Sequence, residues 1–472
     1  MEPSEDTSAV SPVTPPPGCP LHSNAVPLYG EALAEDDTER WERLRKRFGG
    51  LAPVKVEPEV AAWLILGYEE HRQILRDPHL FTHDGRISRE LLEGRLRPEH
   101  GTYPLVNYRP NALHNDGAEH QRLRTALVDS FEKLTSTRVR AAIEDLANDL
   151  IDAFAADGKA DLIGQYATWI PLLTLNRMFG QEDRHGYFLC ELMVKLWNGE
   201  GAEAGAADQA MVEYLTRLIS DKRRRPGPDI TSWLIAHPAE LSDEEVTQQI
   251  LLLIAAAHDP TTHLIGNTLR LLLTNMDLRF SLAASVIQIE EALDVTLWQD
   301  PPFKTLIGRY ATRDTTVAGY QIRRGDMLIP GFAAGNNDPI LRDADGNPPH
   351  AQRPVSRAHL SWGLGPHSCP ARGIAYQIAA TSIATVSARL PDIQLAVDPG
   401  ELRRRPSPSI NGLVELPVTF APQQPLARPH RAEPAPPAPP APPAPTETVE
   451  RPRTIGGIWD RVSGAVRAWF GV

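Results

Sequence analysis

One cysteine late in the chain has the surroundings of a metal-binding thiolate. Cys369 stands in the string Trp-Gly-Leu-Gly-Pro-His-Ser-Cys-Pro-Ala, residues 362–371, whose two glycines at alternate positions predict a tight loop. The sequence from Arg372 onward predicts a helix, and the N-terminus of a helix stabilises a nearby thiolate. A single sulfur without a CxxC partner cannot form a zinc site or a redox dithiol. It can be the axial ligand of a haem iron and promote cleavage of O₂.

This string resembles the haem-binding signature of the cytochrome P-450 haem-thiolate monooxygenases. It matches at the aromatic residue, at both glycines, at the basic His367 and at Cys369. It departs at Ala371, where glycine is more common but a small residue is tolerated. The alternative, a buried cysteine beside a glycine turn, fits a ten-residue match poorly. The resemblance implies a mainly α-helical cytochrome P-450 fold with small β-sheets, and haem b held by Cys369.

A long apolar helix is predicted to carry the oxygen site. Ser242-Asp243-Glu244-Glu245 has the form of a capping box and predicts the start of a helix that runs through Leu273. Pro260 lies inside this helix, where it removes one N–H and crowds a carbonyl at a cost of about 3 kcal/mol. We therefore expect the helix to kink or open there.

By resemblance, this stretch is the oxygen-binding segment of the family, in which an acid and a hydroxyl relay protons. Asp259 matches the acid, whereas the usual hydroxyl position falls on Pro260. The hydroxyl then comes either from Thr261 or from a water held by the freed carbonyl of Ala256. The alternative is that Asp259 and Thr261 only cap a broken helix.

Three further places resemble the ligands that this family provides for the haem propionates. Buried propionates need cationic or hydrogen-bond-donating partners. His120 and Arg124 are four residues apart, so they share one face of a predicted helix. Arg309 lies on a predicted strand, and His367 lies two residues before the cysteine. Any one of these alone is more often a surface charge or a core histidine, but their chain order matches the family.

The chain departs from the family just before the turn Asp300-Pro301-Pro302. Nearly every member carries Glu-x-x-Arg there, a buried ion pair on the proximal side of the haem. Val295 and Trp298 occupy those two positions in this chain, and Asp294 precedes Trp298 by four residues. This resembles a small actinobacterial subgroup that lacks the pair. Apolar packing often replaces a buried ion pair without loss of stability, so we predict a packing role for Trp298.

The elements that must position these residues form one domain over residues 27–421. Helical patterns dominate from residue 119 to 293, and the stretch from 334 to the cysteine is mostly loop. Further elements are predicted as strands at residues 54–56, 61–66 and within 306–333, and as a short helix at 68–76.

The two ends of the chain are predicted to lie outside this domain. Residues 1–26 have the composition of a disordered leader and lack the apolar segment of a signal peptide. Residues 422–452 are a proline-rich linker. Residues 453–472 regain helical periodicity, but their three glycines make an isolated helix marginal. This helix is expected to order against an anionic membrane surface, a groove on another protein, or the protein's own core.

Composition restricts the class of protein further. The three cysteines are scattered, which indicates that the protein is located in a reducing cytoplasm. A peripheral position at the inner membrane face would depend on the C-terminal helix. The longest apolar run, residues 250–257, is far shorter than the ~20 residues of a membrane span. A net charge of −12 gives no support for a nucleic-acid partner.

These features predict a haem-thiolate monooxygenase that inserts one oxygen atom from O₂ into an apolar small molecule. By resemblance, a ferredoxin and its ferredoxin reductase supply the electrons. The alternative is a haem-binding regulatory or sensor protein with the same fold and little or no turnover. Three features motivate that alternative: the missing Glu-x-x-Arg pair, the displaced hydroxyl and the unusual C-terminus.

Overall fold

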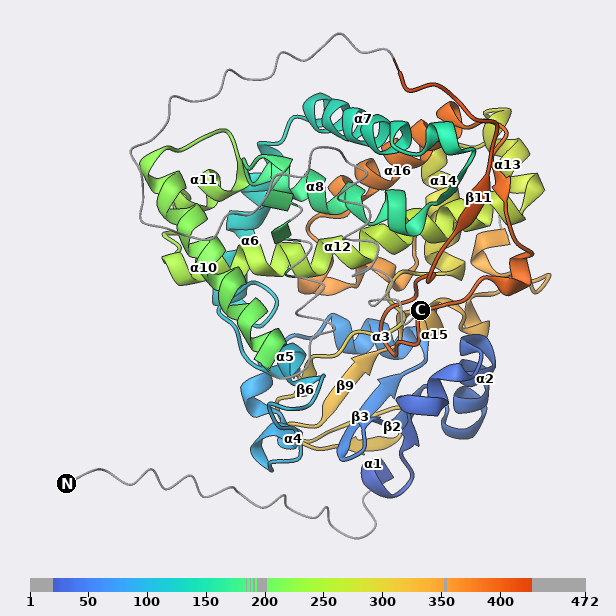
Figure 1. The fold of residues 1–472 in the computed structure, drawn as a ribbon. Helices are drawn as coiled ribbons and strands as arrows, with labels where there is room; N and C mark the ends of the chain where they lie inside the picture. Colours follow the sequence, from blue (N-terminus) through green and yellow to red (C-terminus); the bar gives the residue numbers. More distant parts are fainter. Residues whose placement is uncertain are drawn as a thin grey trace.

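The computed structural model describes residues 20–426, apart from residues 184, 187, 190–191, 193–201 and 352–354. Helices form most of the molecule and lie over a six-stranded sheet, as Figure 1 shows. The predicted fold class is confirmed by this arrangement. The predicted helix 453–472, and most of the leader and of the linker, lie outside the described residues.

The large sheet is built on an antiparallel hairpin of β2 and β3, joined by the turn Pro58-Glu59. Val54 pairs with Ala62 in this hairpin, and Trp63 pairs with Leu328 of the parallel strand β9. All of β3 is buried, as expected for a central apolar strand. The strand order is β1 (Val26–Pro27), β2 (Leu51–Glu57), β3 (Val60–Ile65), β9 (Met327–Pro330), β6 (Arg309–Ala311) and β4 (Phe81–Thr82).

Two smaller sheets complete the β structure of the described residues. One joins β10 (Gln394–Leu395), β11 (Pro417–Thr419) and β5 (Lys159–Asp161), and the other is the hairpin of β7 (Thr315–Val317) and β8 (Tyr320–Ile322). In the first of these sheets, β11 pairs with β5 and so joins the C-terminal part of the domain to the helical layer.

The domain begins earlier than the predicted boundary at residue 27. A short helix, α1 (Pro20–Ser23), precedes β1, which pairs in parallel with β2. Leu21 is buried in the same apolar cluster as Leu51 and Trp63. Residues 20–26 are therefore part of the fold, because one buried leucine and one short strand bind them to the sheet. This contact cannot be predicted from the composition of residues 1–26.

The helical layer holds the predicted site residues in position. The predicted helix 68–76 is present as α3 (Tyr68–Leu75), and the helix after the cysteine is present as α16 (Arg372–Arg389). The other helices of more than five residues for which the structure gives bounds are α2 (Asp37–Phe48), α6 (Gly117–Glu132), α7 (Ser136–Asp152), α8 (Trp169–Met178), α10 (Ala202–Arg224), α11 (Ile230–Ile235), α12 (Asp243–Thr274), α13 (Met276–Ala283) and α14 (Ile289–Gln299). Short helices are α4 (Arg89–Leu92), α5 (Tyr103–Val106) and α15 (Phe332–Asn336). Within the described ranges, every helix is too short or too polar to cross a membrane.

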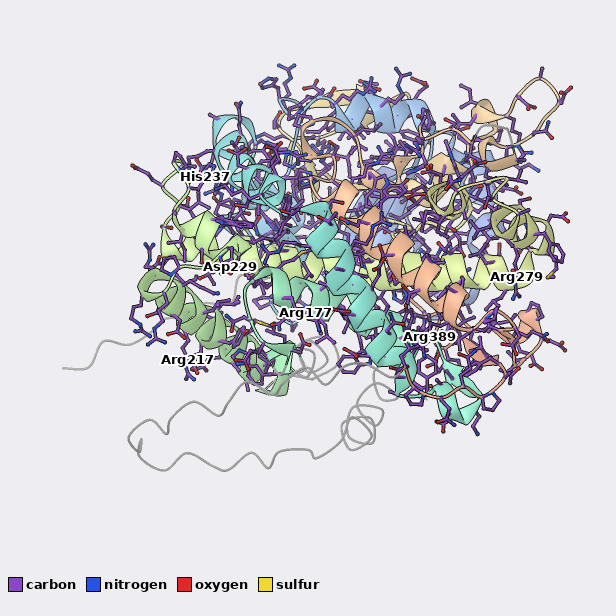
Figure 2. The ribbon with its side chains drawn as sticks, turned by 90° about the horizontal axis from the view of Figure 1, so that it is seen from above. Arg177, Arg217, Asp229, His237, Arg279 and Arg389 are labelled. Carbon is purple, nitrogen blue, oxygen red and sulfur yellow. The ribbon has the colours of Figure 1, made fainter. Side chains whose placement is uncertain are left out.

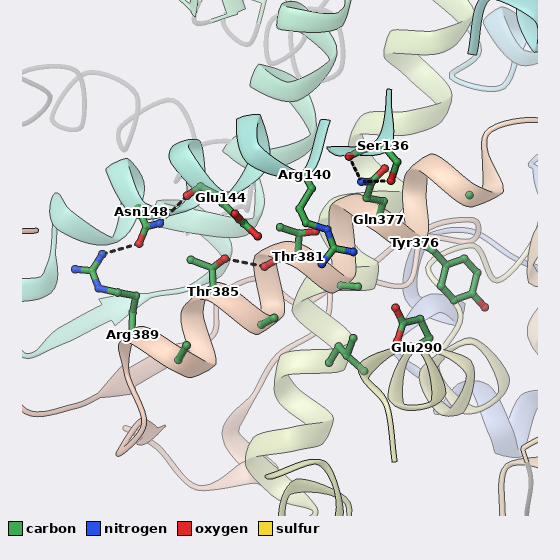
Figure 3. Close-up of a pocket in the computed structure, with 15 residues that line it drawn as sticks. Ser136, Arg140, Glu144, Asn148, Glu290, Tyr376, Gln377, Thr381, Thr385 and Arg389 are labelled. Atoms are coloured by element: carbon green, nitrogen blue, oxygen red, sulfur yellow. Dashed lines mark hydrogen bonds between the residues drawn. The ribbon is translucent and has the colours of Figure 1, made fainter. Parts of the chain in front are cut away.

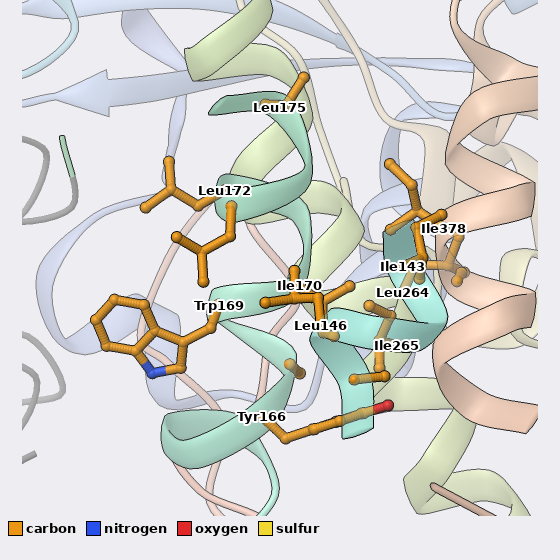
Figure 4. Close-up of a cluster of buried hydrophobic side chains, with 14 of the residues drawn as sticks. Ile143, Leu146, Tyr166, Trp169, Ile170, Leu172, Leu175, Leu264, Ile265 and Ile378 are labelled. Atoms are coloured by element: carbon orange, nitrogen blue, oxygen red, sulfur yellow. The ribbon is translucent and has the colours of Figure 1, made fainter. Parts of the chain in front are cut away.

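The helix α12 crosses the middle of the molecule. Its predicted capping box is present, since Glu245 N donates to Ser242 Oγ at 3.2 Å and Ser242 N donates to Glu245 Oε2 at 2.8 Å. The helix runs unbroken through Pro260, so of the predicted kink or opening, the opening does not occur. The part of the helix after the proline is buried, as Figure 4 shows for Leu264 and Ile265 packed with Tyr166 and Ile378.

Candidate functional site

The loop that presents Cys369 depends on its two glycines. Gly363 and Gly365 have φ angles of +67° and +70°, in the left-handed region that favours glycine. A Cβ atom on Gly365 would lie 2.3 Å from the carbonyl oxygen of Leu75, so a larger residue has no space. The Cys369 N–H donates to the Trp362 carbonyl at 2.8 Å and closes the loop. The α16 helix begins three residues after the cysteine.

The environment of Cys369 suits a metal ligand better than a free nucleophile. Burial raises the pKa of the Cys369 thiol, although the Ala371 N–H and the charges of Arg124 and Arg372 oppose this. The predicted support from backbone N–H groups is therefore present, but burial outweighs it. A coordinated metal ion deprotonates a thiol outright, so a raised pKa does not prevent ligation.

The predicted partners of the propionates converge on this loop. Arg124 Nη2, on α6, donates to the Ser368 carbonyl at 2.6 Å. The ring of His367 lies 4.1 Å from the ring of His120 and 4.1 Å from that of His83, centroid to centroid. The structure thus brings His120, Arg124 and His367 beside Cys369, although α6 and the loop are far apart in sequence.

Arg309 completes this cluster from the strand β6. Its side chain is buried, and its Nη1 donates to the Phe81 carbonyl at 3.0 Å. Burial lowers the pKa of Arg309 to about 10. Burial also lowers the pKa of His83 and of His367, and the charge of Arg309 lowers both further. Because its charge acts on both rings, Arg309 lies close to His83 and His367.

Two buried nitrogens of this cluster are suited to an anionic ligand. Arg309 Nε and His120 Nε2 have no hydrogen-bond partner among the described residues. Buried polar atoms are nearly always satisfied, so unsatisfied ones indicate a missing partner. A sulfur ligand in a loop, beside cationic groups with free donors, fits the chemistry of a haem with its two carboxylates.

Sequence reasoning missed two residues of the cluster, Asp116 and His83. Asp116 Oδ1 lies 2.8 Å from His367 Nε2, and its Oδ2 accepts from Thr82 Oγ1 at 2.6 Å and from the His83 N–H at 2.7 Å. Burial opposes ionisation, but these contacts lower the pKa of Asp116. Asp116 therefore orients His367. The position of Asp116 before a helix was visible in the sequence, whereas nothing local marks His83.

Asp259 lies on the face of α12 that carries exposed small residues. Ala255 and Ala256 are exposed although they are in the middle of the central helix. Arg405 Nη1 contacts Asp259 Oδ2 at 3.3 Å and His263 Nε2 at 3.1 Å. Burial opposes ionisation, but the charges of Arg405, His263 and His258 lower the pKa of Asp259. Asp259 Oδ1 is buried and has no hydrogen-bond partner in the described part of the chain.

Thr261 does not share this face of α12. At 100° per residue it is turned by about 200° from Asp259 and by about 140° from Ala256. Its residue exposure is only 4%, within the core side of the helix. Of the two predicted sources of a hydroxyl, the geometry favours a water over Thr261. Sequence reasoning also missed Arg405 and His263, since only the folded chain brings Arg405 to Asp259.

A buried carboxylate occupies the region where the family pair is absent. Asp294 Oδ2 accepts from Arg357 Nε at 2.9 Å, and Asp294 Oδ1 accepts a short hydrogen bond from the Tyr376 hydroxyl. His359 Nε2 approaches Asp294 Oδ1 to 3.5 Å. Burial opposes ionisation, but the contacts of His359, Tyr376 and Arg357 lower the pKa of Asp294. This carboxylate thus joins α14 to the loop before the cysteine and to α16.

Trp298 belongs to the same junction. Its Nε1 donates to the Ser356 carbonyl at 2.5 Å, and its ring meets that of His359 edge to face, with centroids 5.7 Å apart. Trp298 is 1% exposed, and Val295 is buried in the main core. The predicted packing role of Trp298 agrees with this geometry.

Comparisons with known proteins show similarity over most of the chain. No family model matches. The chain is 30% identical over 402 residues to cytochrome P-450 107B1 of Saccharopolyspora erythraea, across 83% of this chain and 96% of the relative. It is 30% identical over 375 residues to vitamin D(3) 25-hydroxylase of Pseudonocardia autotrophica, across 78% and 90%. The solved structure of CYP154C4 from Streptomyces sp. ATCC 11861 has a TM-score of 0.76 and 27% identity, across 84% and 98%.

Proposed function

Because the chain belongs to the cytochrome P-450 family, we propose that Cys369 would hold the iron of a haem b through its thiolate. The chain is a haem-dependent monooxygenase of this family, as its hydroxylase relatives are named. We assign the propionates to His120, Arg124, Arg309 and His367. The observation that carries this assignment is the pair of unsatisfied buried nitrogens, on His120 and Arg309, beside the cysteine loop.

When bound, the haem supplies the activation of O₂, one atom of which enters the substrate while the other leaves as water. The chain's own residues hold this group and control protons. Arg124 binds the Ser368 carbonyl, which fixes α6 to the cysteine loop. Asp116 fixes the ring of His367 through the contact at 2.8 Å. His120 and Arg309 then offer donors in a fixed orientation, which lowers the entropic cost of binding an anionic group.

We propose that Asp259 holds, at Oδ1, a water that would supply protons for the activation of O₂. Its lowered pKa keeps it ionised at neutral pH, so it accepts a hydrogen bond from water rather than acting as a stored acid. Arg405 binds Oδ2, which leaves Oδ1 for this role. The exposed Ala255 and Ala256 leave space on the same face of α12. Proton delivery requires such a donor within hydrogen-bond reach.

The substrate we propose is an apolar small molecule, and the electron donors are a ferredoxin and its reductase. The relative named vitamin D(3) 25-hydroxylase acts on an apolar compound of this kind, which supports the proposal. The alternative of a regulatory protein without turnover is not favoured, because the named activities of the relatives are hydroxylation and epoxidation.

The test of the ligand is the spectrum of the reduced protein with CO. The wild-type protein should show the strongly red-shifted Soret band of thiolate ligation, and Cys369→Ser should lose it while remaining folded. Cys190→Ser is the matched control and should keep the band. A thiolate-type spectrum in Cys369→Ser would refute the ligand assignment. Consumption of NADPH with surrogate ferredoxin and reductase, coupled to an oxidised product, then tests turnover against the regulatory alternative.

A further inference from the structure

Two aromatic side chains connect the cysteine loop with the surface of the helical layer. The rings of Trp362 and Tyr376 are in contact, with their centroids 5.5 Å apart. Trp362 belongs to the loop, since its carbonyl accepts from the Cys369 N–H at 2.8 Å. Tyr376 lies near the start of α16. A short series of contacts therefore leads from Cys369 through Trp362 to Tyr376.

Tyr376 is also part of the wall of a groove between α7 and α16. The groove has a volume of about 580 Å³, and most of the side chains that line it are polar or charged. Figure 3 shows Tyr376 at one end of the groove, near Glu290 of α14. The other end lies at Arg389, where Figure 2 shows α7 and α16 together. Tyr376 is partly exposed, so small polar molecules in the groove can reach its ring.

The hydroxyl of Tyr376 has a proton acceptor on the side away from solvent. It donates a short hydrogen bond to Asp294 Oδ1, and Arg357 Nε donates to the other carboxylate oxygen at 2.9 Å. Burial raises the pKa of Tyr376, and the hydrogen bond to Asp294 raises it further, so the phenol is protonated at neutral pH. A phenol bound to a carboxylate loses an electron most readily when its proton moves to that carboxylate at the same time.

The charge of Arg372 favours the same coupled loss. Its Cζ lies 5.6 Å from the centroid of the Tyr376 ring. A nearby cation destabilises a positively charged ring but has little effect on a neutral radical. An oxidised phenol is a strong acid, so Asp294 accepts its proton although the pKa of Asp294 is lowered. The surroundings of Tyr376 therefore favour a neutral tyrosyl radical over a radical cation.

The chemistry of the two rings decides the direction in which electrons pass. Tryptophan and tyrosine are among the side chains that lose one electron most readily, whereas biological reductants do not reduce either ring. The pair can therefore give electrons to the cysteine side. A haem with a thiolate ligand promotes cleavage of O₂, and this chemistry leaves a strong oxidant at the haem when no substrate is bound.

We propose that Trp362 and Tyr376 form an electron route that reduces the haem site when O₂ is activated without a substrate. This inference rests on the proposed ligation by Cys369. Tyr376 loses one electron, which passes through Trp362 and the cysteine loop to the oxidised haem, and the phenol proton moves to Asp294. A small reductant in the groove, such as ascorbate or a thiol, then returns one electron to Tyr376, and Asp294 returns the proton. Each cycle moves one electron from the reductant to the haem and leaves both side chains unchanged.

Electron paramagnetic resonance tests this route in the full-length haem protein without substrate. Peracetic acid is the oxidant, and the wild-type protein should give a tyrosyl signal whose lines narrow when its tyrosines are ring-deuterated. Tyr376→Phe should lose this signal, and Trp362→Phe should weaken it. Tyr320→Phe is the matched control and should keep it. The ring of Tyr320 also contacts a tryptophan, Trp63, at 5.2 Å, but its hydroxyl donates to the Phe48 carbonyl rather than to a carboxylate.

A spin trap assigns the radical without any substitution. When the wild-type protein is oxidised in the presence of a nitroso spin trap, mass spectrometry should locate the adduct at Tyr376. The rate of haem bleaching by peracetic acid is a third measurement. With ascorbate present, the wild-type protein should bleach more slowly than Tyr376→Phe, because only the wild-type protein can pass electrons from the groove to the haem.

Three outcomes would overturn the inference. They are an unchanged tyrosyl signal in Tyr376→Phe, a spin-trap adduct only at other residues, and equal bleaching of the two proteins with ascorbate. The spectrum of each reduced protein with CO is recorded first. If the wild-type protein lacks the thiolate band, the proposed ligation fails and the inference fails with it. A thiolate band together with an unchanged tyrosyl signal in Tyr376→Phe refutes the inference alone.

Discussion

Replacement of Trp298 gives the sharpest test of how this chain replaces the missing ion pair. Trp298 is 1% exposed, so Trp298→Ala removes a fully buried indole and leaves a cavity. Truncations of this kind typically lower the free energy of unfolding by about 3–5 kcal/mol. A domain has only about 5–15 kcal/mol in total, so a large part of the stability should be lost.

A second substitution separates packing from hydrogen bonding. Trp298→Phe keeps most of the apolar volume and the ring contact with His359, but it removes the bond from Nε1 to the Ser356 carbonyl. An unsatisfied buried acceptor costs about 1–3 kcal/mol. Ser356 is partly exposed, so water can replace the donor in part and the lower end of this range applies.

Urea unfolding, followed by circular dichroism, measures both variants, and haem retention during gel filtration reports the effect on the cysteine loop. The expected order of stability is wild type, then Trp298→Phe, then Trp298→Ala. Leu92→Ala is the control, since Leu92 is 65% exposed and its truncation should change the free energy of unfolding by less than about 0.5 kcal/mol. If Trp298→Ala unfolds at the wild-type urea concentration, Trp298 does not hold this junction.

Three further predictions concern Asp294, Gly365 and Asp259. The pKa of Asp294 is lower in the folded protein than in the unfolded chain, so its carboxylate stabilises the fold above the unfolded pKa, and this stabilisation is lost as the pH falls through the folded pKa. Asp294→Asn should therefore be less stable than the wild-type protein at neutral pH. In acid, the free energies of unfolding of the two proteins should converge. Gly365→Ala should lower the yield of folded haem protein, because the φ angle of +70° and the nearby Leu75 carbonyl leave no space for a Cβ atom. Gly400→Ala is the control and should have no effect, because the space around Gly400 is open. Asp259→Asn should keep the thiolate spectrum but slow product formation by about 10²–10⁴ and raise the solvent isotope effect, whereas an unchanged rate would remove Asp259 from proton delivery.

Local sequence patterns were sufficient for the parts of the protein that depend on neighbouring residues. The cysteine loop follows from two glycines that tolerate left-handed backbone, and the start of α12 follows from a reciprocal cap over four residues. The spacing of His120 and Arg124 placed both on one helix face. The central strands and the helix α3 were also predictable, because their apolar patterns are short and continuous.

Tertiary structure alone decided the contacts between distant segments. Arg405 reaches Asp259 across 146 residues, and Arg357 reaches Asp294 across 63, so no local pattern marks either pair. The helix α12 continues through Pro260, although the proline by itself favours a break. Burial raised the pKa of Cys369 against the effect of the neighbouring N–H group. The sequence specified which residues carry the chemistry, and long-range packing determined their orientation, charge and partners, because burial and distance exist only in the folded chain.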